Sequence, residues 1–347
     1  MNKRIVTAAV GLTTAGLLAG CGGGGGGGDD KPAASSSATS AKPTQKAAAP
    51  IISLAAATAL LNTYETVNNA ANKTQDAAKL GTVEAGALFQ ESSAQYKQFP
   101  RTTAEERAEY VKPFTYTDRH FYIPTSGSWF MVSAALTGDA FDKGFRQLIV
   151  FAKQADGHWK MVLVNNHLGP LPALAKGPDG APVVVAPDAT VGGTKLSGLD
   201  TAANDLLVSG GKKAGAALAD NAVRRAAVKQ NATRNDDWGK YKGCLRTDYE
   251  DAGAKWDKSY MTYPDRYALK TADGGALVAT TSYYVMLDFS TRPDQCSVVP
   301  EGATTAYLHG DQPGIRSRYA GLDLFSVTGA GKAALLGGDA QLIGASS

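Results

Sequence analysis

Hydrophobic and polar positions change their period within each half of the chain. Over residues 51–80, apolar side chains recur three or four positions apart, which predicts an amphipathic helix that Ser53 can cap. A second helical pattern covers 82–99. From Phe114 onward, apolar, β-branched and aromatic runs alternate with turn-forming segments, which predicts an antiparallel meander of about four strands. The first half therefore places its helices before its strands.

The second half repeats this order. Helical patterns cover 200–209 and 212–241, and strand-like runs follow from Asp265 to the last residues of the chain. A Tyr-x-Asp-Arg motif opens the strands of each half, at 116–119 and at 263–266. We interpret the two halves as tandem α+β units of one ancestral type.

The segment between the halves has a different composition. Residues 169–197 hold five of the 15 prolines and several glycines, which is typical of an interdomain linker. Its run PVVVAP suits an extended segment that lies on a surface. We therefore expect a first α+β domain over 51–168, this linker, and a second α+β domain over 198–347.

Residues 1–20 have the pattern of a secretory signal peptide, with a charged start and an apolar, small-residue run. The run is too short and too rich in glycine for the roughly 20 apolar residues of a membrane-spanning helix. It ends in Leu18-Ala19-Gly20-Cys21, which resembles the lipobox of bacterial lipoproteins. The resemblance implies cleavage before Cys21 and lipidation of its thiol, because a thiolate is the nucleophile that alkylation needs. The alternative is a free cysteine that falls near the cleavage site by coincidence.

A polar, small-residue segment follows the cysteine. Residues 21–50 hold seven consecutive glycines and no large apolar side chain. Such a segment cannot bury enough surface to fold, so we expect a disordered tether with an r.m.s. reach of roughly 30 Å. Two or more acyl chains on Cys21 would anchor it stably, since each buried CH₂ contributes roughly 0.8 kcal/mol. We expect an exported protein, lipid-anchored to the outer face of the cell membrane.

The overall charge argues against a nucleic-acid partner. The formal net charge is +3, and removal of Lys3 and Arg4 with the signal peptide would leave about +1. No stripe of basic residues interleaved with aromatic residues is present. The hydrophobic fraction of 44% and the charged fraction of 19% are those of a globular protein.

The chain has three cysteines, Cys21, Cys244 and Cys296. If Cys21 is acylated, an even pair remains in an exported domain, so we expect a disulfide between Cys244 and Cys296. Closing a loop of this length would stabilise the fold by roughly 2–4 kcal/mol. The alternative is a metal site, but the sequence has no CxxC pair and no histidine at ligand spacing.

Helices followed by a curved antiparallel meander resemble the cystatin-like cone of the nuclear transport factor 2-like superfamily. The lipobox, the Gly/Ser/Ala-rich tether and the alanine-rich units are similar to those of uncharacterised lipoproteins of actinobacteria such as Streptomyces. The resemblance implies an α+β fold of two tandem cone-like units, each with helices packed on a curved antiparallel sheet of about four strands. That superfamily includes isomerases, dehydratases and non-catalytic binding modules, so the fold does not select an activity.

The two motifs supply the candidate chemistry. An aspartate in an apolar pocket can act as a general base, while a tyrosine such as Tyr122 or Tyr283 donates to a developing oxyanion. The alternative is that each arginine pairs with a neighbouring acid and fixes the start of its strand. His120 lies beside the first motif and is a weaker candidate. The candidate pocket or structural-pair residues are Tyr116, Asp118, Arg119, Tyr263, Asp265 and Arg266.

No recognisable catalytic set accompanies these residues. The sequence has no G-x-S-x-G elbow, no H-E-x-x-H motif and no Walker spacing, so we expect no cofactor and no metal. We expect a non-enzymatic ligand-binding or interaction module whose partners are the membrane, through Cys21, and a small ligand or envelope protein. The alternative is a cone-fold isomerase, lyase or hydrolase that uses a buried aspartate. A third interpretation is a structural spacer or assembly factor.

Overall fold

The structure is a computed structural model, and it describes residues 48–137, 146–167, 169–241, 243–251, 263 and 265–347. Its first half has helices before strands, as the hydrophobic pattern predicts. The four strands form an antiparallel sheet in the order β1-β2-β3-β4. The elements are α1 (Leu54–Thr74), α2 (Ala77–Leu80), α3 (Gly86–Gln98), η1 (Phe99–Arg101), α4 (Ala104–Tyr110), β1 (Thr115–Tyr122), β2 (Trp129–Thr137), β3 (Arg146–Lys153) and β4 (Trp159–His167).

The structure confirms the amphipathic helix predicted near the start of the first half, which is α1. The Ser53 side chain accepts a hydrogen bond from the Ala56 amide at 3.2 Å, which caps the first turn. The buried residues of the helix recur at three- and four-residue intervals, so one face lies on the sheet. On that face the ring of Tyr64 meets Phe151 of β3 edge to face, with centroids 6.5 Å apart.

From residue 198 onward, helices again precede strands. The main sheet of the second half has the order β12-β11-β10-β9-β5, and β8 also pairs with β10. The elements are β5 (Val184–Val185), β6 (Thr190–Val191), β7 (Thr194–Lys195), η2 (Leu196–Gly198), α5 (Leu199–Val208), η3 (Ala214–Ala217), α6 (Ala222–Thr233), η4 (Asp236–Tyr241), β8 (Leu245–Asp251), β9 (Arg266–Lys270), β10 (Ala276–Ser290), η6 (Gly302–Ala306), β11 (Gly314–Val327) and β12 (Ala333–Ser346).

The two sheets pack face to face. One cluster of buried apolar side chains includes Leu277 and Leu324 of the second sheet together with residues of the first, and Trp129 of β2 meets Tyr267 of β9 edge to face with ring centroids 5.4 Å apart. The first sheet is consequently covered on both faces, by α1 on one and by the second sheet on the other. The sequence pattern alone suggests only one buried face per unit.

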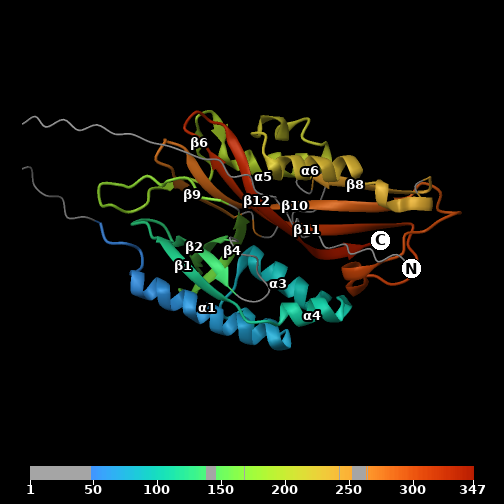
Figure 1. The fold of residues 1–347 in the computed structure, drawn as a ribbon, viewed down its shortest axis with the longest axis horizontal. Helices are drawn as coiled ribbons and strands as arrows, with labels where there is room; N and C mark the ends of the chain where they lie inside the picture. Colours follow the sequence, from blue (N-terminus) through green and yellow to red (C-terminus); the bar gives the residue numbers. More distant parts are fainter. Residues whose placement is uncertain (1–47, 138–145, 168, 242, 252–262, 264) are drawn as a thin grey trace, which may run out of the picture.

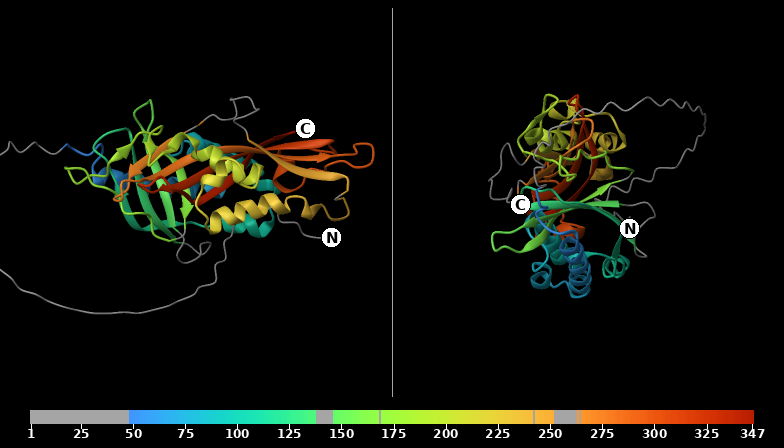
Figure 2. Two further views of the ribbon diagram at one scale, coloured as in Figure 1. Left: turned by 90° about the horizontal axis from the view of Figure 1, so that it is seen from above. Right: turned by 90° about the vertical axis from the view of Figure 1, so that its left-hand side faces the viewer.

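The opposite face of the second sheet carries its own helices. Val278 and Phe325, which alternate with the residues of the shared cluster, pack on Leu206 of α5. Figure 1 shows the resulting layers, with α5 and α6 on one side of the molecule and α1 and α4 on the other. Viewed end-on, the two sheets lie between these helices (Figure 2). The fold is thus mixed α and antiparallel β, with one core that crosses between the halves.

Segment 169–197 is built into the second sheet. Strand β5, which is the middle of the PVVVAP run, pairs antiparallel with β9. The β6–β7 hairpin contacts the turn between β11 and β12, where the Thr194 hydroxyl donates to the Gly331 carbonyl. Gly192 has a φ of 52°, and a Cβ there would stand 2.1 Å from the Gly331 nitrogen. Only glycine fits this close approach, so the hairpin is fixed against the sheet.

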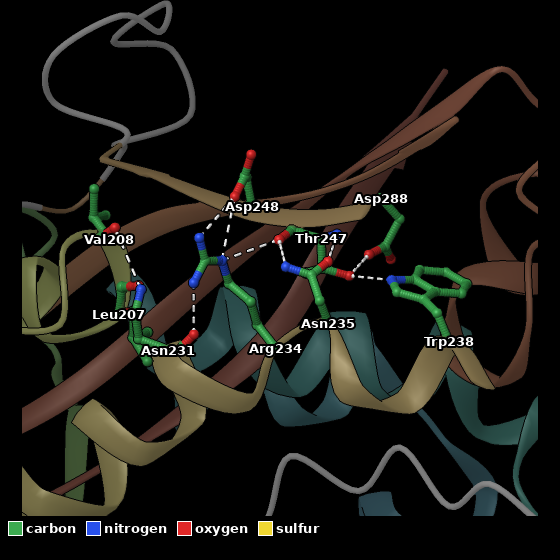
Figure 3. A network of polar contacts seen from close by, with 9 residues as sticks. All are labelled: Leu207, Val208, Asn231, Arg234, Asn235, Trp238, Thr247, Asp248 and Asp288. Carbon is green, nitrogen blue, oxygen red and sulfur yellow. Dashed lines mark hydrogen bonds and ion pairs between the residues drawn. The ribbon is translucent and has the colours of Figure 1, made fainter. Parts of the chain in front are cut away.

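Strand β8 is held by the helical segment that precedes it, and the sequence pattern misses it. Arg234 contacts Asp248 at 3.1 Å, and the Trp238 indole donates to the Thr247 hydroxyl at 3.1 Å. Thr247 in turn donates to Asp288 of β10 at 2.5 Å (Figure 3). Burial raises the pKa of Asp288 to about 6, against the opposing effect of the Thr247 hydrogen bond. These contacts fasten η4 and β8 to the sheet.

A disulfide joins Cys244, directly before β8, to Cys296 in the excursion between β10 and β11. Their Cα atoms lie 6.4 Å apart, and the cysteines are 52 residues apart in sequence. The bond therefore ties the start of β8 to that excursion, at a stabilisation of roughly 3–4 kcal/mol in the chain-entropy picture.

Candidate functional site

The first motif aspartate lies in solvent. Asp118 sits in a β-bulge of β1 with a φ of 46°, and its side chain is 58% exposed. Its carboxylate pairs with the Arg146 guanidinium and contacts the His120 ring at 3.0 Å. The hydrogen bond and charge of Arg146 lower the pKa of Asp118. Asp118 therefore lacks the apolar surroundings that a general base would need, because Arg146 and solvent surround its carboxylate.

The rest of the first motif fastens β1 to α1. Arg119 donates to the Glu65 carboxylate of α1 at 2.6 Å and to the Tyr116 carbonyl at 2.7 Å. The buried Tyr116 hydroxyl donates to Gln147 of β3 at 2.8 Å. These side chains are used within the fold, as the structural-pair interpretation predicts.

The second motif uses its arginine in the same way. Arg266 at the start of β9 contacts Asp200 in the first turn of α5 at 3.5 Å, and it donates to the Pro187 carbonyl at 3.2 Å. Asp200 is therefore a partner of β9 and not the cap of its own helix, because Gly198 is the N-cap of α5. Tyr263 is 37% exposed.

Asp265 has a different environment from Asp118. It is half-buried where the second sheet meets the N-terminus of α3, and burial raises the pKa of its carboxyl. One carboxylate oxygen lies 3.5 Å from where a Cβ on Gly86 would stand, and Gly86 is the first residue of α3. The N-cap residue Ala85 makes no side-chain cap, so this carboxylate faces the positive end of the helix dipole.

Polar side chains from both halves surround this position. The Tyr283 hydroxyl on β10 donates to Gln90 of α3 at 3.3 Å, and burial raises the pKa of Tyr283. The charges of Glu91 and Asp265 are smaller contributions to that rise. We define the junction site as Asp265, Tyr263, Tyr283, Gly86 and Gln90. It contains a half-buried carboxyl group, two tyrosines and a helix N-terminus.

A second buried carboxyl group, that of Glu84, is not among the candidates that the sequence pattern predicts. Glu84, directly before α3, is 1% exposed and accepts hydrogen bonds from Tyr64 at 2.8 Å and Asn68 at 3.3 Å. Burial raises its pKa to about 7, although these hydrogen bonds lower it. The pattern had one usable signal, since Tyr64 and Asn68 lie four apart on the buried face of α1. A buried carboxyl beside a tyrosine thus exists in the first half, but it is not a motif aspartate.

The seam between α3 and the second sheet is acidic. Burial raises the pKa of Glu91 well above its usual range, and the nearby charge of Asp339 adds to this. Burial also raises the pKa of Asp323 to about 7. Asp339, at the edge of the seam, is exposed and accepts from the Asn166 amide of β4 at 3.1 Å. The seam therefore concentrates carboxyl groups that favour the neutral form.

The remaining candidates give no metal or membrane site. Among the residues that the structure describes, no three His, Cys, Asp or Glu side chains are grouped so as to hold a metal ion. His158 and His309 are exposed in turns, and His167 is buried against the Gly169 carbonyl at 3.1 Å. Within the same described ranges, no helix combines the length and apolar character that crossing a bilayer requires. Cys21 and its tether lie outside the described residues.

Comparison with known proteins places the fold in a family. A family model described as a domain of unknown function (DUF8094) matches residues 48–347. An uncharacterised lipoprotein of Streptomyces coelicolor is 30% identical over 270 residues, which cover 75% of this chain and 72% of the relative. No solved structure matches the chain. Since the family model spans the whole folded part, both sheets and the segment between them, the chain belongs to the DUF8094 family.

Proposed function

We propose that this chain is an exported lipoprotein, acylated at Cys21 and held at the outer face of the cell membrane. The lipobox Leu18-Ala19-Gly20-Cys21 and the Streptomyces relative, itself a lipoprotein, support this. The Cys244–Cys296 disulfide suits an exported domain. Cells fed a labelled fatty acid should incorporate it into the protein, and Cys21→Ser should abolish labelling and release the chain from membranes. Unlabelled wild-type protein would refute the anchor.

The folded part is proposed to be two cone-like units, 51–168 and 198–347, joined by 169–197, that act as a non-enzymatic binding module. The observation that carries this proposal is the use of both motif arginines. Arg119 ties β1 to α1 and Arg266 ties β9 to α5, so both motif arginines support the architecture. Asp118 is likewise held by Arg146.

The junction site is the proposed ligand-binding region. It offers the half-buried Asp265 as an acceptor and the exposed ring of Tyr263 as a flat, partly apolar surface, a combination that suits a small organic ligand with a hydrogen-bond donor. A screen of small ligands against the mature Cys21→Ser chain should give a ligand whose affinity falls at least about tenfold in Asp265→Asn. Asp118→Asn is the matched control and should bind normally. A ligand that is insensitive to Asp265→Asn would remove the junction site from the proposal.

The second candidate is acid–base catalysis at the same place. Burial raises the pKa of Asp265, and the Tyr283 hydroxyl lies in the same region, which is the pairing of a base and a donor that a cone-fold isomerase or lyase needs. Turnover lost in Asp265→Asn and kept in Asp118→Asn would establish this reading over the binding module.

A further inference from the structure

The outer surface of the second half carries a cluster of basic side chains. Between Lys212 and Arg234 the sequence has six Lys or Arg residues and one acid, Asp220, a formal net charge of +5. The chain without residues 1–20 is nearly neutral, so an excess of acidic residues in the rest of the chain offsets the positive charge of this segment. We define the basic face as Lys212, Lys213, Arg224, Arg225 and Lys229.

The fold brings these residues to one surface. Val223, Ala227 and Val228 turn the apolar side of α6 toward the core beneath it. Arg225 and Lys229 are four residues apart on the exposed side of the helix.

The loop after α5 adds the other two lysines. Gly211 has a φ of 74°, and the Arg224 guanidinium lies 3.5 Å from where a Cβ on Gly211 would stand. The exposed Lys212 and Lys213 follow directly, so the loop and the helix form one continuous surface.

One exposed acid, Asp220, and the buried Asp205 beside Lys213 moderate the charge of this surface without cancelling it. Asp220 contacts Arg225 at 2.7 Å and Arg224 at 3.7 Å. Arg225 remains 61% exposed and Asp220 63% exposed, so water screens this pair. The three lysines are all exposed. A surface that presents several cations, with one exposed acid among them, fits a partner of dispersed negative charge.

We infer that the basic face docks on anionic phospholipid headgroups of the membrane that anchors the chain. This inference rests on the proposed acylation of Cys21. The tether expected over residues 21–50, with an r.m.s. reach of roughly 30 Å, would keep the folded part close to the headgroup layer. Each basic residue near an anionic surface strengthens binding by up to about fivefold, and the lipid anchor removes most of the cost of finding the surface.

Docking through this face would also orient the molecule. Figure 1 shows α6 and α1 on opposite sides of the two sheets, so a membrane under α6 leaves α1 and α4 facing away from it. The junction site would then lie neither on the membrane-facing side nor on the opposite side of the molecule, because α3 and β9 belong to the middle layers.

The test uses the mature chain with Cys21→Ser, so that no acyl chain contributes to binding. It should sediment with vesicles of equal parts phosphatidylglycerol and phosphatidylcholine, but not with phosphatidylcholine vesicles, and added salt should release it. The triple variant Lys212→Gln, Lys213→Gln, Lys229→Gln should bind at least about tenfold more weakly. The matched control is Lys73→Gln, Lys79→Gln, Lys153→Gln, which removes three exposed lysines elsewhere and should bind normally.

Equal losses in both triple variants would overturn the proposal, because net charge rather than this face would then govern binding. So would failure to bind the anionic vesicles, including the case in which the chain binds only soluble polyphosphate. A protein that binds vesicles through this face but takes up no labelled fatty acid would contradict the anchor instead, so the two proposals fail separately.

Discussion

The two Tyr-x-Asp-Arg motifs share an arginine with one role and differ in the role of the aspartate. Arg119 contacts Glu65 of α1, and Arg266 contacts Asp200 of α5, so each arginine joins a strand of its half to a helix. Asp118, by contrast, stands in solvent beside Arg146, whereas Asp265 is half-buried against the N-terminus of α3. The arginine has the same role in both motifs because its partners lie within its own half. The aspartates differ because only Asp265 lies against the other half of the molecule.

The largest expected effect concerns two buried carboxyl groups, Glu84 beside α1 and Asp323 in the acidic seam. Burial raises the pKa values of Glu84 and Asp323 to about 7 in the folded protein, well above their values in an unfolded chain. A carboxyl with a raised folded pKa costs nothing while protonated in both states, and it destabilises the fold as pH rises from about 4 to about 7. Urea unfolding should therefore give a free energy of unfolding at least about 2 kcal/mol higher at pH 5 than at pH 8.

Glu84→Gln is the variant that assigns this dependence. The amide keeps the hydrogen bonds from Tyr64 and Asn68 in reach and removes the titration, so the difference between pH 5 and pH 8 should shrink by about 1 kcal/mol or more. Glu65→Gln is the control, because Glu65 belongs to the first motif's ion pair. A stability that rises from pH 5 to pH 8 would contradict the picture of a seam held together by neutral acids.

The sequence predicts most of the helices and strands. It predicts the environment of the motif residues less well. The period of Leu61 and Tyr64 predicts α1, and the apolar runs predict β1 to β4 and β9 to β12. Strand β8 is missed because Arg246, Asp248 and Glu250 alternate with its buried residues at an edge, so the segment looks polar.

The candidate site is harder to predict because it joins distant segments. Asp265 and Gly86 are far apart in sequence, and only the packing of one half on the other brings them together. The local pattern of apolar and polar residues carries no information about such a contact. The sequence therefore predicts the same environment for the Asp-Arg dipeptides of both motifs, at 118–119 and 265–266. Glu84 is missed for the same reason, since its burial depends on β4 and α1 at once.

The next effect in size compares the two arginines. Arg266 has an 11% exposed side chain and Arg119 a 22% exposed one, and each variant leaves its helix acid without that arginine. Arg266→Met should lower the free energy of unfolding by about 2–3 kcal/mol, and Arg119→Met by about 1–2 kcal/mol, because Arg266 is the more buried of the two arginines. Urea titrations of both variants at one pH measure this. A larger loss in Arg119→Met would reverse the ranking of the two motifs.

The two aspartates should affect stability with opposite signs. The folded pKa of Asp265 is raised by burial, so Asp265→Asn should stabilise the protein at pH 7, by about 1 kcal/mol, and have little effect at pH 3. The folded pKa of Asp118 is lowered chiefly by Arg146, so Asp118→Asn should destabilise it at pH 7, and this loss should fade as pH falls below the unfolded value. Thermal unfolding of both variants across this range checks the signs. Equal signs would mean that the two aspartates share one environment after all.

The smallest expected effect concerns the tyrosines. Tyr283→Phe removes a hydrogen bond to Gln90 of 3.3 Å that joins the two halves, whereas Tyr116→Phe removes one to Gln147 of 2.8 Å within the first half. The longer bond is the weaker, so Tyr283→Phe should cost about 0.5 kcal/mol and Tyr116→Phe about 1 kcal/mol. Hydrogen exchange at the amides of α3 distinguishes them further, since only Tyr283→Phe should speed exchange there. If Tyr116→Phe speeded exchange at the α3 amides as much, the stability of α3 would depend on contacts inside the first sheet rather than on the Tyr283–Gln90 contact between the halves.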